Sequence, residues 1–367
     1  MNTRSMSTPP LRLEDRLAKR GGAVELLRLP AAAFGVAAGL RSRLYDRGWL
    51  PHEKLGVPVI CVGNLTVGGT GKTPMVVWLA RELLKRGRRP GLLSRGYGKG
   101  HEEKNDEAFE MERALPGVPH IQNPDRVAGG RALLEQGVDV VVMDDGFQHR
   151  RLVRDLDLVM VDATRPWGLP YPDAEGEAVC ALIPRGFLRE TPAALRRANA
   201  IILTRTDQST EERVDALRRE LEARAPGVPI VDTVHSATGL RAIRGPVLEL
   251  EQLRGLQIEL FSGIGNPAGF EETARALGAE VLQHRRFPDH HSYVAGDLIG
   301  LGEGQPVLTT AKDISKCEAL APMDRLYVLE VELAIQRGEP VLDALLDSLV
   351  AGFAERQRNS IHAGLHG

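Results

Sequence analysis

The stretch that decides the fold is Val57-Pro58-Val59-Ile60-Cys61-Val62 followed shortly by Gly68-Gly69-Thr70-Gly71-Lys72-Thr73. An apolar run, a glycine-rich loop and a helical pattern over residues 75–86 occur in that order. Strand, loop and helix are the context in which a Gly-Lys-Thr motif forms a phosphate-binding loop. The loop amides and the positive end of the helix dipole would face phosphate oxygens. We therefore predict a nucleotide-binding P-loop here.

Within this loop, Lys72 would reach the β- and γ-phosphates, and the Thr73 hydroxyl would bind Mg²⁺. The common pattern has glycine five residues before Gly71, where this chain has Thr66; neighbouring glycines could supply the turn instead. The alternative is an ordinary glycine turn with a surface lysine. The predicted nucleotide-binding residues are Thr66, Val67, Gly68, Gly69, Thr70, Gly71, Lys72 and Thr73.

Composition limits the class of protein. A chain of 367 residues predicts two domains, and 43% hydrophobic with 26% charged residues is typical of a globular protein. The net charge of −2 argues against a general nucleic-acid binder. Three cysteines far apart show neither metal-ligand spacing nor a disulfide framework, which favours a reducing cytoplasm.

The first 50 residues differ from the rest, with nine Arg and Lys against four Asp and Glu. An apolar run over residues 29–40 is flanked by Arg28, Arg41 and Arg43. Twelve residues are too few to span a bilayer, which takes about 20, and the run starts late for a signal peptide. Two interpretations remain: a helix in the membrane interface with arginines at anionic headgroups, or an ordinary core helix.

Further apolar runs, separated by helical segments, predict the rest of the sheet. Runs at residues 89–94, 138–143, 156–161 and 200–203 favour a doubly wound parallel sheet. A second unit begins near residue 245, where residues 260–267 repeat the strand-to-glycine-turn design without a sequence repeat. Helices at 268–277 and 340–354 and strands at 307–310 and 326–329 complete it.

The predicted fold is therefore α/β: a P-loop NTPase-like doubly wound parallel sheet and a second, smaller α/β domain, preceded, in the first of the two interpretations above, by an N-terminal membrane-associated helix. The predicted divisions are residues 1–50 for the membrane-associating segment, 51–244 for the nucleotide-binding domain, and 245–367 for a smaller domain that closes over the site.

Asp144 is the candidate magnesium ligand, because it ends the apolar run 138–143 beside the P-loop. Asp145 can share that site. The alternative is a helix cap or a turn aspartate. His149, four residues further on, could contact phosphate or cap a turn.

The base of the nucleotide has two candidate partners. Asp207 follows Thr204 in a Thr-x-x-Asp arrangement at a strand end, and residues 309–313 offer Thr-Thr-Ala-Lys-Asp. A simple turn aspartate is the alternative for Asp207.

Residues 287–293 are the densest titratable cluster, with adjacent His290 and His291. They could be a metal pair, a general base or a solvated loop. Neighbouring residues on a strand point to opposite faces, so one histidine in proton transfer is the simpler interpretation.

Four arginines are candidates for anion contacts. Arg95 and Arg126 could stabilise transition-state charge. Arg185 and Arg189, in the irregular loop 179–190, could bind an anionic substrate or face water.

Taken together, these motifs resemble the tetraacyldisaccharide 4′-kinase (lipid A 4′-kinase) family. The matching stretches run in the family's order: residues 62–64 leading into 68–74, 94–98, 106–107, 144–149, 261–267, 287–291 and 309–313. Two departures are Asn105, where the family often has glycine, and residues 184–190, where Arg185 and Phe187 replace the usual residues.

The resemblance implies transfer of the ATP γ-phosphate to the 4′-hydroxyl of a tetraacylated glucosamine disaccharide 1-phosphate, with ATP and Mg²⁺ as cofactors. It implies work at the cytoplasmic face of the bacterial inner membrane, where the N-terminal segment looks like the family's membrane-associating helix. The partners expected are the lipid A precursor and the membrane surface, with no nucleic acid and no obligate protein partner.

For the site, the resemblance implies that Asp106 is the catalytic carboxylate and that it works with His290, or with His291 if the doubled histidine shifts the register. Arg126 matches an arginine near the nucleotide phosphates, beside Lys72. A P-loop nucleotide-dependent switch or metallochaperone, with Asp207 selecting guanine, is the alternative. A peripheral membrane-binding protein with a degenerate nucleotide site is a third interpretation.

Overall fold

The computed structural model describes residues 13–18, 21–96, 106–171, 177–289, 291–321 and 323–364. In this part of the chain an 11-stranded sheet has the order β3-β2-β4-β1-β5-β6-β7-β11-β10-β8-β9. The strands are β1 (Val59–Asn64), β2 (Pro90–Ser94), β3 (His120–Gln122), β4 (Val140–Asp144), β5 (Leu156–Asp162), β6 (Ala200–Thr204), β7 (Ile230–Arg244), β8 (Gln257–Ser262), β9 (Glu280–Arg286), β10 (Val307–Thr309) and β11 (Leu326–Arg337).

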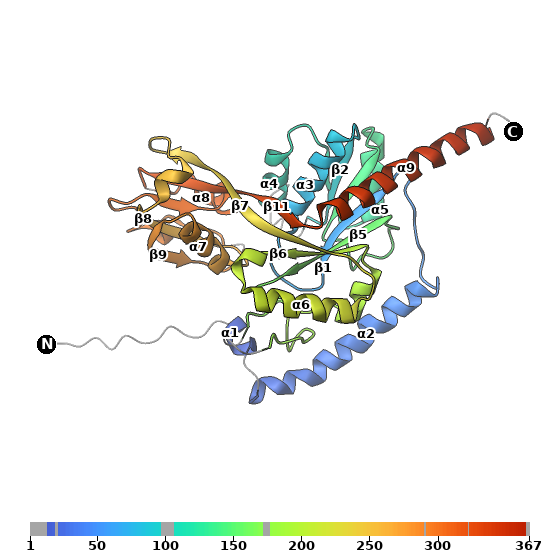
Figure 1. Ribbon diagram of the computed structural model, residues 1–367, viewed down its shortest axis with the longest axis horizontal. Helices are drawn as coiled ribbons and strands as arrows, with labels where there is room; N and C mark the ends of the chain where they lie inside the picture. The colour runs from blue at the N-terminus through green and yellow to red at the C-terminus, as the bar shows by residue number, and fades with distance from the viewer. Residues whose placement is uncertain are drawn as a thin grey trace.

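Helices cover both faces of this sheet (Figure 1). The α-helices are α1 (Leu13–Ala18), α2 (Arg28–Asp46), α3 (Lys72–Lys85), α4 (Asp106–Ala114), α5 (Arg126–Glu135), α6 (Glu211–Arg224), α7 (Pro267–Ala276), α8 (Ala311–Cys317) and α9 (Glu339–Gly364). The 3-10 helices are η1 (Ala23–Leu27), η2 (Pro192–Arg197), η3 (Thr206–Gln208), η4 (Leu250–Leu253) and η5 (Ala295–Leu298).

The first lobe is the parallel part of the sheet, from β3 to β6. Successive residues of β1 point to opposite faces. Val59 and Cys61 enter the core beneath α5 and α6, whereas Ile60 and Val62 enter the core beneath α3 and α4. The predicted doubly wound parallel sheet is confirmed.

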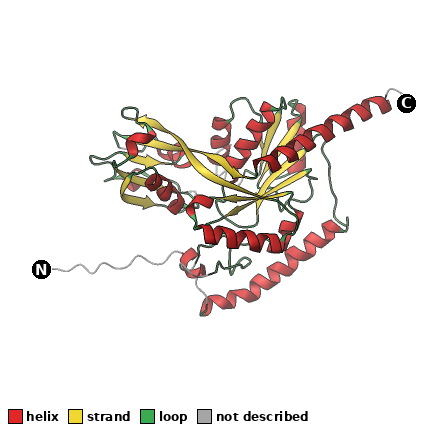
Figure 2. Cartoon of the chain, viewed as in Figure 1, coloured by secondary structure: helices red, strands yellow, loops and turns green. Residues whose placement is uncertain are grey.

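Two long antiparallel strands join the lobes. β7 pairs with β6 over its first residues and with β11 along the rest of its length, and β11 continues to β10. These two strands stretch across the molecule in Figure 2. The sequence analysis did not predict β7, and the strand predicted at 326–329 extends to Arg337. The sheet is therefore continuous past residue 244.

The second lobe is a smaller α/β unit built on β10, β8 and β9. Its two cores lie on opposite faces, one including Ile314 and Cys317 of α8 and the other including Phe270 and Ala274 of α7. This arrangement confirms the predicted smaller α/β part.

The last helix packs against the first lobe. Leu342 and Leu346 of α9 share a core with α3, and Arg86 of α3 binds Asp343 at 2.5 Å and Asp347 at 2.9 Å. The helix predicted at 340–354 thus belongs by packing to the nucleotide-binding side, although its residues follow the second lobe in sequence.

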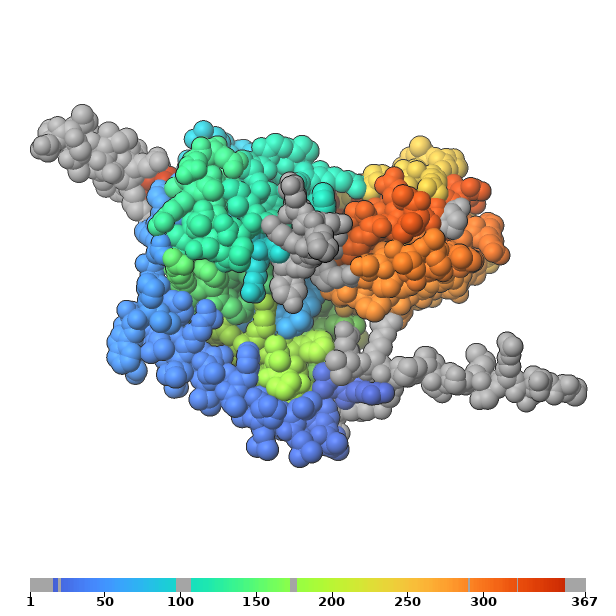
Figure 3. All heavy atoms as spheres, turned by 180° about the vertical axis from the view of Figure 1, so that it is seen from behind, coloured from blue at the N-terminus to red at the C-terminus, as the bar shows by residue number. Residues whose placement is uncertain are grey.

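α2 lies along the outside of the molecule, apart from the sheet (Figures 1 and 3). Leu29 is 77% exposed and Val36 73% exposed, which excludes the core-helix interpretation. Residues 23–46 form one continuous helical segment of 24 residues, and an 18-residue window within it has a mean hydropathy of 1.5. By length and composition it could cross a membrane, so the 12-residue length considered from sequence was too short.

Candidate active site

The P-loop connects β1 to α3 as the sequence predicts. Gly68 (φ 118°) and Gly71 (φ 84°) adopt positive φ, which only glycine tolerates readily. Asn64 Nδ2 donates to Thr70 Oγ1 at 2.9 Å and fixes the loop. Gly71, at the N-cap of α3, brings no side chain to cap the helix. The first amides of α3 therefore have no side-chain cap and are available to an anion.

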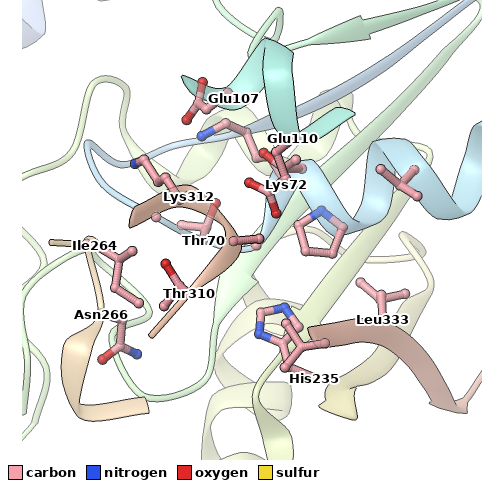
Figure 4. A pocket seen from close by; sticks show the side chains of 18 of the residues that line it. Thr70, Lys72, Glu107, Glu110, His235, Ile264, Asn266, Thr310, Lys312 and Leu333 are labelled. Atoms are coloured by element: carbon pink, nitrogen blue, oxygen red, sulfur yellow. The ribbon is translucent and has the colours of Figure 1, made fainter. Parts of the chain in front are cut away.

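A cavity of about 900 Å³ lies in front of this loop, lined by residues of both lobes. Figure 4 shows Lys72, Glu107 and Lys312 pointing into one space, with Ile264 and Thr310 of the second lobe on the side of the cavity opposite α3. All eight predicted nucleotide-binding residues line the cavity. Residues from both lobes also line the cavity, among them Ser94, Arg95, Gly96, Glu107, Glu110, Asp144, Asp145, Arg189, Gln208, His235, Ile264, Gly265, Asn266, Gly269, Phe270, Asp289, Thr310 and Lys312.

Asp144 lies at the end of β4, beside Val62 of β1. It is only 4% exposed, and its Oδ1 is buried without a hydrogen-bond partner among the described residues. Burial, reinforced by the charge of Glu107, raises the pKa of this carboxyl to about 7. A buried carboxylate oxygen without a donor fits a cation.

The donor set around Asp144 suits Mg²⁺ in particular. The described residues contain no group of three or more His, Cys, Asp and Glu side chains that could hold a metal by themselves. Magnesium is usually bound by one or two protein oxygens together with substrate phosphates and water. Thr73 and Asp145 line the same cavity, so the residues present fit this ion.

Asp145 is tethered by two cations. Arg189 donates to its carboxylate with both terminal nitrogens, at 3.0 and 2.7 Å, and Lys72 Nζ lies 3.7 Å away. Although burial opposes ionisation, the charges of Lys72 and Arg189 hold the pKa of Asp145 below its usual range. Arg189 also donates to Asn64 Oδ1 and so ties the loop 184–190 to the P-loop strand.

Arg126 lies behind the cavity. Its side chain is 2% exposed, and its guanidinium donates to the main-chain oxygens of Asn123 at 2.9 Å and Asp144 at 3.3 Å. It does not line the cavity. Its contacts therefore hold the end of β4, which carries Asp144.

The predicted proton-transfer pair is only partly described. Asp106 is the first residue of α4, but its side chain lies outside the described residues, as does all of His290. The residues after Asp106 on α4, Glu107 and Glu110, line the cavity. Burial and the nearby charge of Glu107 raise the pKa of Glu110 to about 7, against the opposing effect of Lys312.

His291 is engaged within the second lobe. Its Nε2 lies 2.9 Å from Asp297 Oδ2, and its ring stacks on Phe287 with centroids 4.6 Å apart. It does not line the cavity, whereas the neighbouring Asp289 does and binds Lys312 at 2.8 Å.

The 309–313 segment divides into two roles. Asp313 is buried and accepts hydrogen bonds from Gly263 N and Tyr293 Oη, both at 2.9 Å, so it holds the second lobe together. Thr310 and Lys312 line the cavity. Asp207 lies in η3 and does not line the cavity, but the adjacent Gln208 does and donates to Gly269 O at 3.2 Å.

His235 was missed by the sequence analysis. It comes from β7, and a Cβ placed on Gly71 would lie 2.9 Å from its Nε2, which is buried without a hydrogen-bond partner. Burial and the nearby Arg205 lower the pKa of this histidine to about 3, so it is neutral. A single histidine in an unpredicted strand carries no sequence signal that could have revealed it.

Of the three remaining candidates, Arg95 lines the cavity, at the end of β2, and Arg185 and His149 do not. Arg185 is fully buried and donates to Leu17 O at 2.7 Å and to Glu25 at 2.7 Å, so it holds the N-terminal segment and does not face the cavity. His149 also does not line the cavity, and burial lowers its pKa.

A helix start open to anions after a glycine loop, an unpaired strand-end carboxylate and a doubly wound sheet define a P-loop nucleotide-binding protein. Comparison with known proteins narrows this class. The sequence model of the LpxK family, described as "Tetraacyldisaccharide-1-P 4'-kinase", matches residues 23–351. The chain belongs to this family, which confirms the resemblance and the predicted lipid A 4′-kinase function; the switch or metallochaperone alternative is not favoured.

Individual relatives agree. A tetraacyldisaccharide 4′-kinase of Anaeromyxobacter dehalogenans (strain 2CP-C) is 42% identical over 352 residues, covering 87% of this chain and 89% of that protein. One of Syntrophus aciditrophicus is 37% identical over 343 residues, covering 85% and 88%. The crystal structure of LpxK from Aquifex aeolicus in complex with ATP matches with a TM-score of 0.68 and 30% identity, over 89% of this chain and 99% of that one.

Proposed function

We propose that this chain transfers the γ-phosphate of ATP to the 4′-hydroxyl of a tetraacylated disaccharide 1-phosphate in the cavity between its lobes. The observation that carries the proposal is that Lys72, the open start of α3 and the unpaired carboxylate oxygen of Asp144 meet in one cavity. The P-loop residues 66–73 would bind the triphosphate, and Lys72 would offset negative charge on the transferred group.

Thr73 and Asp144 would hold Mg²⁺, with Asp145 beside them. When bound, this ion supplies positive charge that stabilises the phosphates during transfer. Arg126 would act through Asp144, because its guanidinium binds the main-chain oxygen of that residue. Arg189 would keep Asp145 ionised and in place.

We propose that Asp106 and His290 take the proton from the sugar hydroxyl, a contribution of about 10²–10⁴-fold. Support for His290 over His291 comes from the bond of His291 to Asp297 inside the second lobe. Since His290 would come from the lobe opposite α4, closure of the lobes would complete the site and exclude water.

A comparison of His290→Ala with His291→Ala tests this assignment. His290→Ala should lower kcat far more than it raises KM for ATP, and His291→Ala should retain most of the turnover. The reverse pattern would transfer the catalytic role to His291.

We further propose that α2 lies at the cytoplasmic face of the inner membrane. Support comes from its exposed apolar side chains, such as Leu29 and Val36, beside Arg28, Arg41 and Arg43. The acyl chains would stay in the bilayer while the sugar reaches the cavity. In a sedimentation assay with anionic vesicles, Val36→Glu should reduce binding, whereas Val247→Glu, at an equally exposed position of the second lobe, should not.

The reaction itself is tested by incubating the purified protein with labelled ATP, Mg²⁺ and the lipid disaccharide in detergent and measuring the mass of the lipid product. A gain of one phosphate at the 4′ position is expected. Tight GTP binding with no lipid product would favour the switch alternative instead.

A further inference from the structure

A buried histidine at one end of the sheet bridges a serine and a glutamate. His120, on β3, has its Nε2 2.8 Å from Ser94 Oγ at the end of β2 and its Nδ1 3.3 Å from Glu112 on α4. The imidazole is 1% exposed and Ser94 is 5% exposed. Three side chains from three elements thus meet; the histidine and the serine are shielded from water, whereas the Glu112 side chain is 28% exposed.

A similar arrangement recurs at the opposite end, where the histidine–glutamate contact is a hydrogen bond; the 3.3 Å contact between His120 and Glu112 is an ion-pair distance without hydrogen-bond geometry. His284, on β9, has its Nε2 2.8 Å from Ser262 Oγ at the end of β8 and its Nδ1 3.0 Å from Glu271 on α7. This imidazole is 3% exposed and Ser262 is fully buried. Arg286 also contacts both His284 and Glu271.

The two bridges occupy equivalent positions in two β–α–β units. In the first unit, β2 pairs with β3 so that Leu92 lies beside His120. In the second, β8 pairs with β9 so that Leu260 lies beside His284. In each unit the histidine lies two residues before the residue that pairs with the terminal serine. The helix between the two strands supplies the glutamate. The two units repeat this geometry without a sequence repeat.

Each bridge ties down a segment that lines the cavity. Ser94 is followed by Arg95 and Gly96, and α4 begins with Asp106 and continues to the cavity-lining Glu107 and Glu110. Ser262 is followed by the glycine turn of residues 263–266, which leads into α7, where Gly269 and Phe270 line the cavity. Glu112 and Glu271 lie further along these two helices.

We propose that the two Ser–His–Glu bridges are positioning devices for phosphoryl transfer. The first fixes α4, and with it Asp106, relative to the end of β2. The second fixes α7 and the glycine turn, which packs against the P-loop: a Cβ placed on Gly265 would lie 2.8 Å from Gly69 N. Ser262 is fully buried and Ser94 is 5% exposed, so we assign both serines to holding the histidines and not to nucleophilic attack.

The two bridges should therefore affect different kinetic constants. Displacing α4 moves the residues that act on the acceptor hydroxyl, so kcat should fall. Displacing the glycine turn weakens its contact with the P-loop, which would bind the triphosphate. KM for ATP should therefore rise. This distinction rests on the proposed catalytic role of Asp106.

The test compares His120→Ala and His284→Ala in the full-length enzyme, with labelled ATP and the lipid disaccharide as substrates. His120→Ala should lower kcat by about ten- to a hundredfold and leave KM for ATP within about twofold. His284→Ala should raise KM for ATP by about five- to tenfold with a smaller change in kcat. His120→Gln, whose amide can still reach Ser94, should recover part of the lost turnover.

Three further measurements keep the inference open to refutation. In a double-mutant cycle, Ser94→Ala should add little to His120→Ala, because both break one bridge. If His120→Ala does not fold, Ser94→Ala and His120→Gln provide the same kinetic comparison. Variants with a lower Tm but unchanged kcat and KM in the folded enzyme would overturn the proposal, since the bridges would then only stabilise the fold.

Asp106→Ala distinguishes a failure of the positioning role of the bridges from a failure of the catalytic role proposed for Asp106. An inactive Asp106→Ala enzyme together with a fully active His120→Ala enzyme defeats the positioning role alone. An active Asp106→Ala enzyme defeats the catalytic assignment on which the kcat prediction depends.

Discussion

Two strand–turn–helix units face each other across the cavity, and only one has a helix start open to an anion. At the start of α3, Gly71 has no side chain to cap the helix. At the start of α7, Asn266 Oδ1 accepts from Gly269 N at 3.1 Å, and Pro267 has no amide hydrogen to offer. The same design therefore leaves a helix start open to an anion in one lobe and serves as a packing surface in the other, depending on what occupies the first turn.

The two turns touch through glycine. A Cβ placed on Gly265 of the second lobe would lie 2.8 Å from Gly69 N, so this position admits only glycine, whereas a Cβ on Gly69 would lie 3.8 Å from Gly265 Cα, an ordinary contact distance. The capped start of α7 thus lies against the loop that leads into the open start of α3.

The largest effect is expected from Lys72→Ala, which removes the cation at the open helix start. Activity should fall by about a thousandfold, because the charge of the transferred phosphoryl group loses its nearest side-chain partner. Lys85→Ala, on the same helix but 71% exposed, is the matched control and should stay near wild type. Initial rates with labelled ATP and lipid acceptor measure both; an active Lys72→Ala enzyme would remove the P-loop from the mechanism.

Arg189→Ala should have the next largest effect, about a hundredfold in kcat. It leaves Asp145 without the paired hydrogen bonds that hold it beside Lys72. Arg189→Lys should recover little, since an ammonium cannot make both bonds in that plane. Arg196→Ala, which loses only a bond to the main chain of Arg224, should remain active and serves as the control.

Gly265→Ala tests the contact between the turns. The added methyl would lie 2.8 Å from Gly69 N, so the closed arrangement should be disfavoured and kcat/KM for ATP should fall about tenfold. Gly296→Ala, in the same lobe with nothing within 4 Å of the new methyl, should leave kcat/KM unchanged. Equal activity of the two variants would show that the turns need not meet during turnover.

The smallest effect is expected at Glu110, a residue of α4 that lines the cavity. The pKa of Glu110 is about 7 in the folded protein against 4.5 when unperturbed, so above pH 7 the folded state must ionise a largely buried carboxyl. Glu110→Gln should therefore increase the free energy of unfolding by about 1 kcal/mol at pH 8, less than the full linkage because some solvent contact remains. The gain should shrink as pH falls through 7 and vanish below about 4.5; thermal unfolding across this range measures it, and a constant gain contradicts the titration.

Much of the first lobe follows from the sequence because its signals are local. The apolar runs that became β1, β4 and β5 are continuous and buried, and the Gly-Lys-Thr motif indicates where the glycine loop ends and α3 begins. The position of Asp144 at the end of a strand could be predicted because this residue immediately follows the apolar run 138–143.

The joining region could not be predicted in this way. The second half of β7 is mostly intermediate in burial and shows no regular alternation, so no pattern indicates a strand. His235 was hidden for that reason. The bond between Arg189 and Asp145 joins residues 44 positions apart, and only the folded chain brings them together.

The two strands that cross between the lobes have a mechanical consequence. Because β7 and β11 stay hydrogen-bonded from one lobe to the other, the lobes can bend or twist about this ribbon but cannot slide past each other. The register slips between Glu330 and Val331, and both residues line the cavity. Opening the cavity between the lobes must therefore deform these two strands. Any molecule that stiffens the strands also limits how far the cavity can open.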